Sequence, residues 1–473
     1  MIQFYNTKTR RVDEFHPLSE GEVLVYTCGP TVYNFLHVGN WVAYIRWDIL
    51  VRMLAASGYD VKRVMNITDV GHLVSDADDG EDKMEKGAKR EGKTAWEVAK
   101  MYTDDFLDGM QKLGLIEPTF ITKATDYIPQ QLELVRKLKA KGYTYQISDG
   151  IYFDTSKFKT YADFAKLDLA GEEAGARVEF NPEKRNPSDF ALWKFSPIDE
   201  KRDMEWDTPQ DLLEDNMPHK GFPGWHLECS AMAMDKLGET IDIHTGGIDH
   251  IPVHHTNEIA QSEAVTGKPF ANYWLHNNFL LVDGTKVSKS IGNTYELKDL
   301  AAKGFSPQDF RMFVLQSHYA TESNFTWENL QAAKNRLNSY RAMAQMRYQP
   351  QIASNKVDFE SAYQAMLEAS QDDLNTPVAL QILSDVGGRV EENGIAAGDS
   401  ESFETFLVKL DALMGTQLSI EQDISDEQKA LIQKREVARV AKDWSASDKL
   451  RDELAAQGIS IRDTDAGSIW SRT

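Results

Sequence analysis

The two cysteines of this 473-residue chain both lie next to residues that can bind metals or move protons. Cys28 opens the segment Cys-Gly-Pro-Thr-Val-Tyr, and Cys229 closes the segment Gly-Trp-His-Leu-Glu-Cys. A free cysteine can pack simply as a small hydrophobic residue, so two inert core residues are one interpretation. Thiolates, imidazoles and carboxylates are also the ligands that zinc prefers, which makes both thiols candidate zinc ligands.

A concentration of histidines favours the metal interpretation. Seven of the 11 histidines fall in one short stretch: His219, His226, His244, His250, His254, His255 and His276. Within it, His254 and Glu258 are spaced i, i+4, which places them on one face of a helix. Together with the two cysteines they would complete a four-ligand set for zinc. His250 and His255 are alternatives to His254 that the spacing does not exclude.

Three further segments have the residue types of a phosphate site. His37-Val-Gly-Asn40 opens a helical pattern, and the free N–H groups of a helix start suit a polyphosphate. His244-Thr-Gly-Gly-Ile-Asp249 has adjacent glycines, which let the backbone approach a ligand closely. Lys286-Val-Ser-Lys-Ser290 is a cationic loop that could stabilise charge in a phosphate transition state. An ordinary helix start, a plain turn and a solvated loop are the alternatives. The candidates are His37, Gly39, Asn40, Gly246, Gly247, Asp249, Lys286, Ser288, Lys289 and Ser290.

The composition excludes several classes of protein. Hydrophobic residues make up 41% of the chain and aromatic residues 10%, so a wholly disordered chain is excluded. No apolar run approaches the roughly 20 residues of a membrane span, and the N-terminal residues lack the apolar core of a signal peptide. We therefore expect a cytoplasmic protein with no membrane contact. Because the net charge is −22, any nucleic acid must bind to a local basic face.

The N-terminal half predicts a nucleotide-binding sheet. A strand at 22–27, a helix at about 39–56 and a strand at 59–67 form the unit of a doubly wound sheet. The second half of the sheet is expected from about 225 to 293, with a strand at 240–244. This order of elements predicts an α/β fold of the Rossmann type.

The segments between the two halves of the sheet are more varied. Helical patterns cover 95–113 and 127–140. The highly charged residues 76–93 indicate a loop. Short strand patterns broken by proline, glycine and charges predict an insertion in the sheet at about 115–218.

Beyond about residue 305 the patterns become helical. One apolar stripe at helical spacing predicts an amphipathic helix: Phe403, Phe406, Leu407, Leu410, Leu413 and Met414. Near the end, five basic residues on a helical stretch could contact RNA or form a solvated face: Arg435, Arg439, Lys442, Lys449 and Arg451. We expect linkers at 349–356 and 416–427.

The order of these motifs resembles that of a class I aminoacyl-tRNA synthetase, and the two cysteine segments resemble those of the cysteinyl-tRNA synthetase family. The similarity runs almost end to end. It includes Asn66-Ile-Thr-Asp, Gly175-Ala-Arg-Val-Glu, Asn186-Pro-Ser-Asp-Phe-Ala-Leu-Trp-Lys, Asp372-Asp-Leu-Asn-Thr-Pro and Lys442-Asp-Trp-Ser-Ala-Ser-Asp-Lys-Leu-Arg. This chain differs in having Asn40 where the wider class has a second histidine, and Val287 where methionine is usual.

This resemblance implies a domain organisation. Residues 1–304 would form the Rossmann catalytic domain with its inserted subdomain. Residues 305–415 would form a region that contacts the tRNA stem and an all-α anticodon-binding bundle. Residues 428–473 would form a small C-terminal domain. The implied partners are L-cysteine, ATP and tRNA(Cys), and we expect a monomer.

The resemblance also implies roles for individual residues. One zinc ion per chain would be bound by Cys28, Cys229, His254 and Glu258, and Mg²⁺ would accompany ATP. His37, Asn40, Lys286 and Lys289 would be catalytic, and the ATP site would comprise the phosphate candidates named above. The cysteine pocket would include Gly29, Thr31, Thr68 and Trp225.

The implied reaction explains why a metal would be needed. The cysteine carboxylate attacks the α-phosphate of ATP, and the resulting cysteinyl-adenylate is transferred to tRNA. Cysteine and serine differ by one atom, which a hydrophobic pocket separates poorly. A thiol binds zinc readily as a thiolate and an alcohol does not, so zinc would select the substrate without activating water. Two alternatives are a cysteine ligase of thiol biosynthesis that forms an adenylate, and an inactive zinc-binding paralogue.

Overall fold

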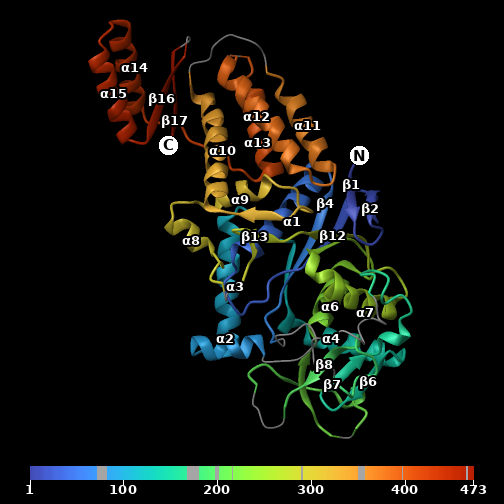
Figure 1. Ribbon diagram of the computed structural model, residues 1–473. Coiled ribbons are helices and arrows are strands. Elements are labelled where there is room, and N and C mark those ends of the chain that lie inside the picture. Colours follow the sequence, from blue (N-terminus) through green and yellow to red (C-terminus); the bar gives the residue numbers. More distant parts are fainter. Residues whose placement is uncertain are drawn as a thin grey trace.

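The computed structural model describes residues 1–71, 82–167, 181–197, 202–215, 217–288, 291–349, 357–396, 398–464 and 467–472. Its parts are stacked along one long axis (Figure 1). A parallel sheet lies in the middle, a second sheet lies at one end, and a helical bundle lies at the other with a small C-terminal unit beside it. Among the described helices, none combines the length and apolar character needed to cross a bilayer.

The central sheet has five parallel strands in the order β12-β11-β3-β4-β5. Their bounds are β3 Glu22–Thr27, β4 Asp60–Ile67, β5 Phe120–Lys123, β11 Ile241–Gly247 and β12 Ala271–Asn277. The chain moves outward from β3 to β4 and β5, and then returns to β11 on the other side. The order of the strands therefore reverses between β3 and β11, where ligands bind in such sheets, at the carboxyl ends of the strands. The predicted doubly wound sheet is confirmed.

Four helices accompany this sheet: α1 Val38–Ala56, α3 Ala95–Lys112, α6 Trp225–Leu237 and α7 Thr256–Thr266. Helix α1 packs against β4 and β11, and α6 packs against β3 and β4. The expected helix at 39–56 and the expected strands at 22–27 and 59–67 therefore match α1, β3 and β4 within a residue or so. A hairpin of β1 Gln3–Asn6 and β2 Arg11–Glu14 precedes the sheet.

The second sheet is antiparallel, in the order β6-β7-β8-β10-β9. Its strands are β6 Thr144–Ile147, β7 Gly150–Phe153, β8 Phe190–Phe195, β9 Trp206–Asp207 and β10 Lys220–Pro223. Helix α4, Ile128–Ala140, packs against β6, α6 and α7. The strand β5, which lies within the range expected for the insertion, is the edge strand of the central sheet.

The loop expected at 76–93 was wrong for the part that the structure describes. Helix α2 covers Lys83–Glu91, and the Asp82 side chain caps it by accepting hydrogen bonds from the backbone of the first turn. Met84 and Ala88 are buried against the neighbouring elements. The many charges concealed a short amphipathic face. Residues 72–81 lie outside the described part of the chain.

The described residues between 280 and 414 are mainly helical and include a three-stranded sheet of β13 Leu280–Val282, β14 Thr285–Lys286 and β15 Ser323–Phe325. Its helices are α8 Leu297–Ala302, α9 Pro307–Leu315, α10 Trp327–Gln345, α11 Phe359–Gln371, α12 Thr376–Asn393 and α13 Ser400–Met414. The apolar stripe predicted at 403–414 is confirmed, because all six of its residues are buried in α13. Residues 350–356 of the first expected linker lie outside the described residues.

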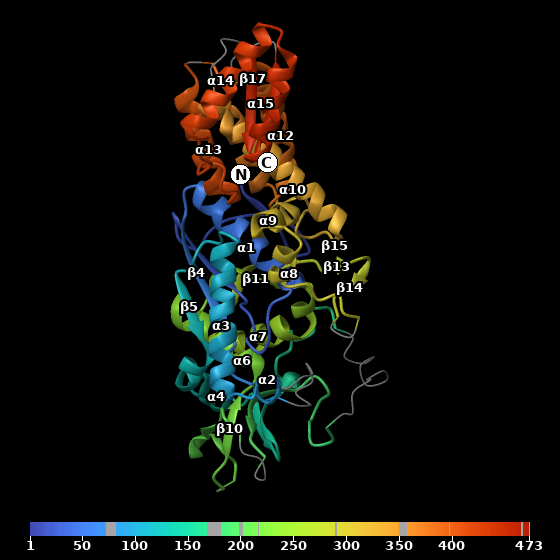
Figure 2. The same ribbon diagram turned by 90° about the vertical axis from the view of Figure 1, so that its left-hand side faces the viewer.

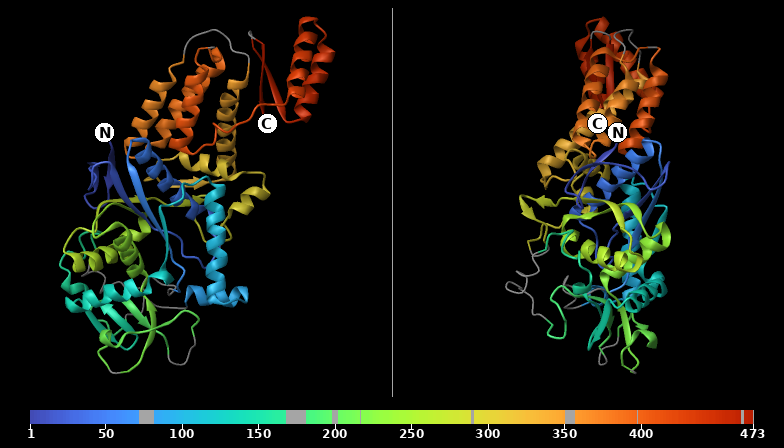
Figure 3. Two further views of the ribbon diagram at one scale, coloured as in Figure 1. Left: turned by 180° about the vertical axis from the view of Figure 1, so that it is seen from behind. Right: turned by 90° about the vertical axis from the view of Figure 1, so that its right-hand side faces the viewer.

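The main hydrophobic core is continuous from the N-terminal hairpin through the central sheet into the bundle. It includes Phe4 of β1, the buried side chains of α1 and those of α11 to α13. Seen from behind, the N-terminus lies beside the base of the bundle (Figure 3). There the Tyr5 backbone N–H donates to the Asp373 carboxylate at 2.8 Å. The sheet and the bundle are therefore packed as one body.

A buried ionic contact reinforces this joint. The Asp48 carboxylate in α1 accepts hydrogen bonds from Arg311 at 2.6 Å and from Arg52 at 2.7 Å. The Ile116 backbone N–H also donates to it, at 2.7 Å. Arg311, on α9, donates in addition to the carbonyl of Met414 at the end of α13, at 2.9 Å. One carboxylate of helix α1 is thus connected to α9 directly and to the end of α13 through Arg311.

The C-terminal unit has its own small core. Helices α14 Asp426–Val440 and α15 Trp444–Ala456 pack beside the hairpin of β16 Ile459–Thr464 and β17 Gly467–Arg472. Figure 2 shows this unit at the end of the molecule that carries the bundle. Arg435, Arg439 and Arg451 all contact the Asp463 carboxylate, at 2.6, 2.7 and 2.9 Å. Three of the five basic residues singled out above therefore have an internal role that neither interpretation of the stretch anticipated.

Candidate active site

A pocket of about 510 Å³ opens at the carboxyl ends of the central strands. Cys28 follows β3, Thr68 follows β4, Gly247 ends β11 and Asn277 ends β12. The place where the strand order reverses is thus also the place where the sequence motifs converge. The pocket is lined by candidates from every predicted group: Cys28, Gly29, Thr31, His37, Gly39, Asn40, Thr68, Trp225, Cys229, Gly246, Gly247, Asp249, His254 and Lys286.

The four expected metal ligands meet at the floor of this pocket, where Cys28, Cys229 and His254 line it and Glu258 lies buried beneath them. Cys28 comes from the end of β3, Cys229 from α6, and Glu258 from α7. His254 belongs to a π-helical turn, Ile251–His255, that leads directly into α7. The ligand atoms of the four residues all lie within 4.8 Å of one another, and the His254 Nε2 atom is 3.0 Å from Glu258 Oε1. The structure therefore gathers donors from three distant parts of the chain around one point.

The polar atoms around this point fit a cation. Glu258 is fully buried, and its Oε1 atom faces the His254 Nε2 atom at 3.0 Å without a well-formed hydrogen bond. His254 Nδ1 lies 2.9 Å from His226 Nδ1. If His254 carries its proton on Nδ1, the lone pair of its Nε2 atom points toward the place where the other metal ligands meet. Such an outer partner is typical of a histidine that binds a metal. The donor set of two sulfurs, one nitrogen and one oxygen is one that zinc accepts.

The pKa values of the four expected ligands in the metal-free site are shifted by burial and by their neighbours. Burial raises the pKa of Cys28, but hydrogen bonds with Cys229 and nearby histidines outweigh it and hold the pKa well below the usual thiol value. Burial and the adjacent Cys28 raise the pKa of Cys229 well above that value. Burial lowers the pKa of His254, but Glu258 outweighs burial and raises it to about 10. Glu258 itself, although burial opposes its ionisation, has a pKa of about 2 because His244 and His254 face it. A proton on His254 thus supplies the positive charge that a metal would supply.

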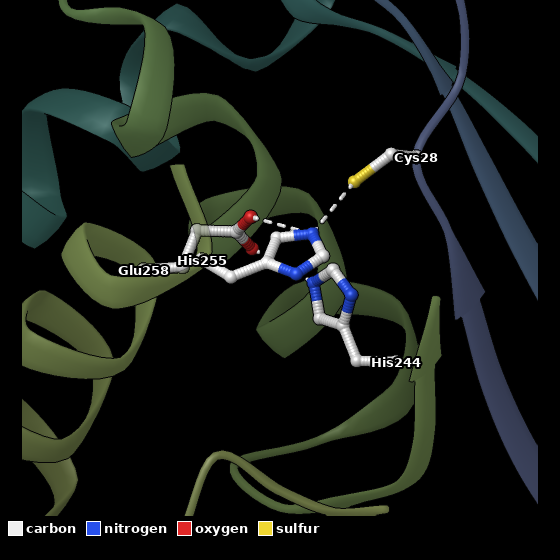
Figure 4. Close-up of side chains that lie close together, drawn as sticks. All are labelled: Cys28, His244, His255 and Glu258. Carbon is white, nitrogen blue, oxygen red and sulfur yellow. Dashed lines mark hydrogen bonds and ion pairs between the residues drawn. The ribbon is translucent and has the colours of Figure 1, made fainter. Parts of the chain in front are cut away.

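The two alternative histidines lie in different places. His255 belongs to a second group of possible ligands, with Cys28, His244 and Glu258 (Figure 4). His250 belongs to neither group found among the described residues, and it lines the pocket instead. The geometry thus assigns His254, His255 and His250 to three different positions, which their spacing in the sequence could not do.

The first phosphate motif lies where it was expected, at the start of α1. His37 is the N-cap residue, and its backbone N–H donates to the Asn40 side chain at 3.1 Å. A Cβ on Gly39 would lie 3.0 Å from the His37 ring, so glycine leaves room for that ring. The motif therefore presents a helix N-terminus and an imidazole to the pocket.

The other two phosphate motifs are placed differently. A Cβ on Gly246 would lie 2.6 Å from the ring of His255, so this glycine is needed for histidine packing as well as for access to the pocket. Lys286 reaches the pocket from β14, with its ammonium 4.8 Å from the centre of the Phe279 ring. The Ser288 backbone N–H donates to Asn293 at 2.7 Å. Lys289 and Ser290 lie outside the described residues.

The residues expected to form the cysteine pocket surround the metal ligands. A Cβ on Gly29 would lie 1.6 Å from the Asn66 carbonyl oxygen, so only glycine fits there. Thr31 and Thr68 pair through their backbones, and the Thr68 hydroxyl donates to Glu228 at 2.9 Å. The Trp225 ring lies 4.3 Å from the His254 ring, centre to centre.

Sequence reasoning missed two charged residues here. Glu228 is fully buried and holds Thr68 in place. Glu228 directly precedes Cys229, and its position in that motif could have indicated a role in the site. Lys83 lines the pocket with its ammonium 5.5 Å from the centre of the Trp225 ring. The loop predicted around Lys83 gave no reason to place it in a site.

Comparison with known proteins decides the family. The family described as "tRNA synthetases class I (C) catalytic domain" matches residues 14–335, and the "Cysteinyl-tRNA ligase anticodon binding domain" matches residues 421–470. A Burkholderia lata protein named "Cysteine--tRNA ligase 1" is 43% identical, over 98% of this chain and 96% of its own length. The chain belongs to the cysteine–tRNA ligase family. A Treponema denticola cysteine–tRNA ligase is 40% identical over 100% of this chain and 99% of its own length.

Solved structures show the same fold in more distant proteins. The Mycobacterium tuberculosis methionyl-tRNA synthetase bound to methionyl-adenylate matches with a TM-score of 0.60 at 15% identity, over 84% of this chain and 92% of that one. The Agrobacterium radiobacter LeuRS in its complex with tRNA and LeuAMS matches with a TM-score of 0.61 at 13% identity, over 86% and 85%. As a member of the cysteine–tRNA ligase family, the chain is an aminoacyl-tRNA synthetase, and the expected fold class and enzyme class are confirmed.

Proposed function

We propose that this chain joins L-cysteine to tRNA(Cys) through a cysteinyl-adenylate, with zinc recognising the cysteine thiolate. The observation that carries the proposal is the convergence of two unrelated donor sets on one pocket. Cys28, Cys229 and His254 line the same cavity as the helix start at His37 and Asn40. A thiol held at the first set would thus share the pocket with a phosphate held at the second.

The zinc site would provide the selectivity. When bound by Cys28, Cys229, His254 and Glu258, one zinc ion per chain supplies a soft Lewis acid that favours a thiolate over an alcohol. Gly29, Thr31, Thr68 and Trp225 would form the remaining walls of the cysteine pocket. The tight approach of Gly29 to Asn66 and the contact of Trp225 with His254 support this assignment because they fix the walls relative to the donors.

The phosphates of Mg²⁺-bound ATP would lie against the start of α1. His37, Gly39 and Asn40 would bind them, and Lys286 and Lys289 would neutralise charge in the transition state, because positioning and charge dominate phosphoryl transfer. Gly246, Gly247 and Asp249 would bind the nucleoside, with Ser288 and Ser290 completing the loop. Seven of these residues line the pocket, which supports this arrangement: His37, Gly39, Asn40, Gly246, Gly247, Asp249 and Lys286.

The remaining regions would recognise the tRNA. We propose the catalytic domain at 1–304, a stem-contact and anticodon-binding region at 305–415 and a small C-terminal domain at 428–473 that takes part in anticodon binding, acting as a cytoplasmic monomer. Because β5 belongs to the central sheet, we propose that the insertion begins after β5, near residue 124. The match of residues 421–470 to an anticodon-binding domain favours a tRNA ligase over a cysteine ligase of thiol biosynthesis.

The test is a pair of assays on the full chain. Cysteine should drive exchange of pyrophosphate into ATP, serine should not, and tRNA fractions containing tRNA(Cys) should be charged. Lys289→Ala should slow the exchange by about 10²–10³-fold, the usual loss for one transition-state stabiliser. Lys303→Ala, an exposed lysine over Trp327, is the control that should change little. Equal exchange with serine and cysteine would refute selection by zinc, and exchange without any charging would refute the proposed product.

A further inference from the structure

A second set of metal donors lies beside the first, on its inner side. Cys28, His244, His255 and Glu258 place their ligand atoms within 4.8 Å of one another. The Cys28 sulfur lies 3.5 Å from His255 Nε2, and His244 Nε2 lies 2.9 Å from Glu258 Oε2. In Figure 4, the His255 ring lies in the centre, with the Glu258 carboxylate on one side of it and the side chains of Cys28 and His244 on the other. Two of these donors, Cys28 and Glu258, also belong to the first set.

The two sets differ in their access to the pocket. Cys28, Cys229 and His254 line the pocket, whereas His244, His255 and Glu258 do not. The last three side chains are fully buried. An ion held by the first set, the outer seat, would thus face a substrate. An ion held by the second set, the inner seat, would be closed off from it.

The charges also suit an ion in a dry position. The inner seat offers one thiolate, one carboxylate and two imidazoles, so a doubly charged metal would leave no net charge. Burial of an uncompensated charge is costly, and a neutral assembly avoids that cost. The outer seat offers two thiolates and one carboxylate, which would leave one negative charge next to the pocket. Each seat therefore matches its surroundings.

Hydrogen bonds behind the inner seat hold one of its histidines in position. His255 Nδ1 lies 2.7 Å from His276 Nε2, and His276 Nδ1 lies 2.7 Å from the Thr7 hydroxyl. A proton on each Nδ1 would leave His255 Nε2 free to bind a metal. Outer partners of this kind orient metal ligands and are themselves worth about 10–100-fold in metal affinity. The ring of His244 is also fixed, because it stacks on Trp274 with ring centres 4.5 Å apart.

We propose that Cys28, His244, His255 and Glu258 form a second seat for a zinc ion, and that one ion occupies either the outer or the inner seat. The proposal rests on the proposed function in that the outer seat is the one that recognises cysteine. Because Cys28 and Glu258 are shared, movement of the ion exchanges only Cys229 and His254 for His244 and His255. The position of the ion thus determines whether the pocket can bind a thiol.

Two matched double variants of the full chain test the proposal. Cys229→Ala with His254→Gln removes both ligands that are unique to the outer seat and leaves the inner seat complete. Cys229→Ala with His255→Gln changes the neighbouring histidine and leaves neither seat complete. Each is loaded with zinc or cobalt(II), the metal content is measured at controlled free metal, and the cobalt spectrum reports the number of thiolates. Circular dichroism confirms folding, and Cys229→Ala alone provides a milder version of the first variant.

We expect the first double variant to retain about one metal per chain with one thiolate ligand, and to bind cysteine poorly. The second should bind metal at least about 100-fold more weakly, because loss of a ligand costs no less than loss of an outer partner. The proposal is overturned if the first variant, and Cys229→Ala with it, lose metal as completely as the second. If the wild type binds no metal, the zinc part of the proposed function fails instead, so the two failures are distinguishable.

Discussion

Replacement of Asp48 by asparagine tests whether the buried ionic contact holds the catalytic sheet and the bundle together. The substitution keeps the shape of the side chain and removes its charge. Arg311 and Arg52 would then lie at 2.6 and 2.7 Å from a neutral amide. Arg311 has 1% exposure and cannot exchange its lost partner for water. The substitution therefore leaves buried positive charge without a counter-charge.

The expected cost follows from burial. Removal of one partner from a buried ion pair typically destabilises a protein by about 3–5 kcal/mol. Asp104 provides the comparison, because it also pairs with a basic residue on its own helix, Lys100 at 2.5 Å, but at an exposed position. An exposed pair contributes about 0–1 kcal/mol. We expect Asp48→Asn to lower the free energy of unfolding by about 2 kcal/mol or more beyond the effect of Asp104→Asn.

The pH dependence gives a second, independent readout. Burial raises the pKa of Asp48, but Arg311, Arg52 and the Ile116 N–H outweigh burial and lower it below the ordinary value. A depressed folded pKa contributes stability that is complete above the unfolded value, about 3.9, and is lost as the pH falls through the folded value. The difference between wild type and Asp48→Asn should therefore be largest near neutral pH and shrink in acid.

Urea unfolding followed by tryptophan fluorescence measures both effects in parallel for the two variants. The midpoint of the first transition is compared, because a chain with several domains need not unfold in one step. If Asp48→Asn destabilises the protein no more than Asp104→Asn, or by an amount that does not change with pH, the ionic contact does not hold the joint.

Three further outcomes are expected. In the Cys229→Ala background, where only the inner seat is complete, Gly246→Ala should weaken zinc binding by about 10–100-fold, measured by competition with a chelator, because the new methyl group would displace the His255 ring. In metal-free protein, Cys28 should be alkylated near pH 7 at a rate that changes little as the pH rises, because its pKa is lowered. Cys229 should react slowly near pH 7, and its rate should increase as the pH rises, because its pKa is raised. Mass spectrometry distinguishes the two sites. Asp463→Asn should loosen the C-terminal unit, since three arginines lose their shared carboxylate, and proteolysis of that unit should accelerate while cysteine activation persists.

The sequence was most informative where local pattern and chemistry agree. Strands β3 and β4 and helix α1 were predicted because their apolar residues follow a simple period, and α13 because its stripe is unbroken. The four expected donors do converge. Cys28 follows β3, the segment after β11 carries His254 and Glu258 to the same edge of the sheet, and α6 brings Cys229 there.

The rest depends on contacts that no local pattern contains. Helix α2 was hidden because only three of its residues, Met84, Gly87 and Ala88, are buried. The choice between His254 and His255 depends on a π-helical turn that spacing arguments do not anticipate. The role of Arg435 could not be foreseen, because its partner Asp463 lies in a hairpin 28 residues later and only folding brings them within 2.6 Å.

The continuous core has a consequence for how the protein is made. The N-terminal hairpin packs into the same core as Leu418, and Tyr5 is bonded to Asp373. Domains of most large proteins fold in turn as they leave the ribosome. Here the residues of the pocket are synthesised early, but the core that steadies them closes only when the bundle has emerged. Chains from interrupted translation should therefore remain open to proteases and be removed before they can consume ATP.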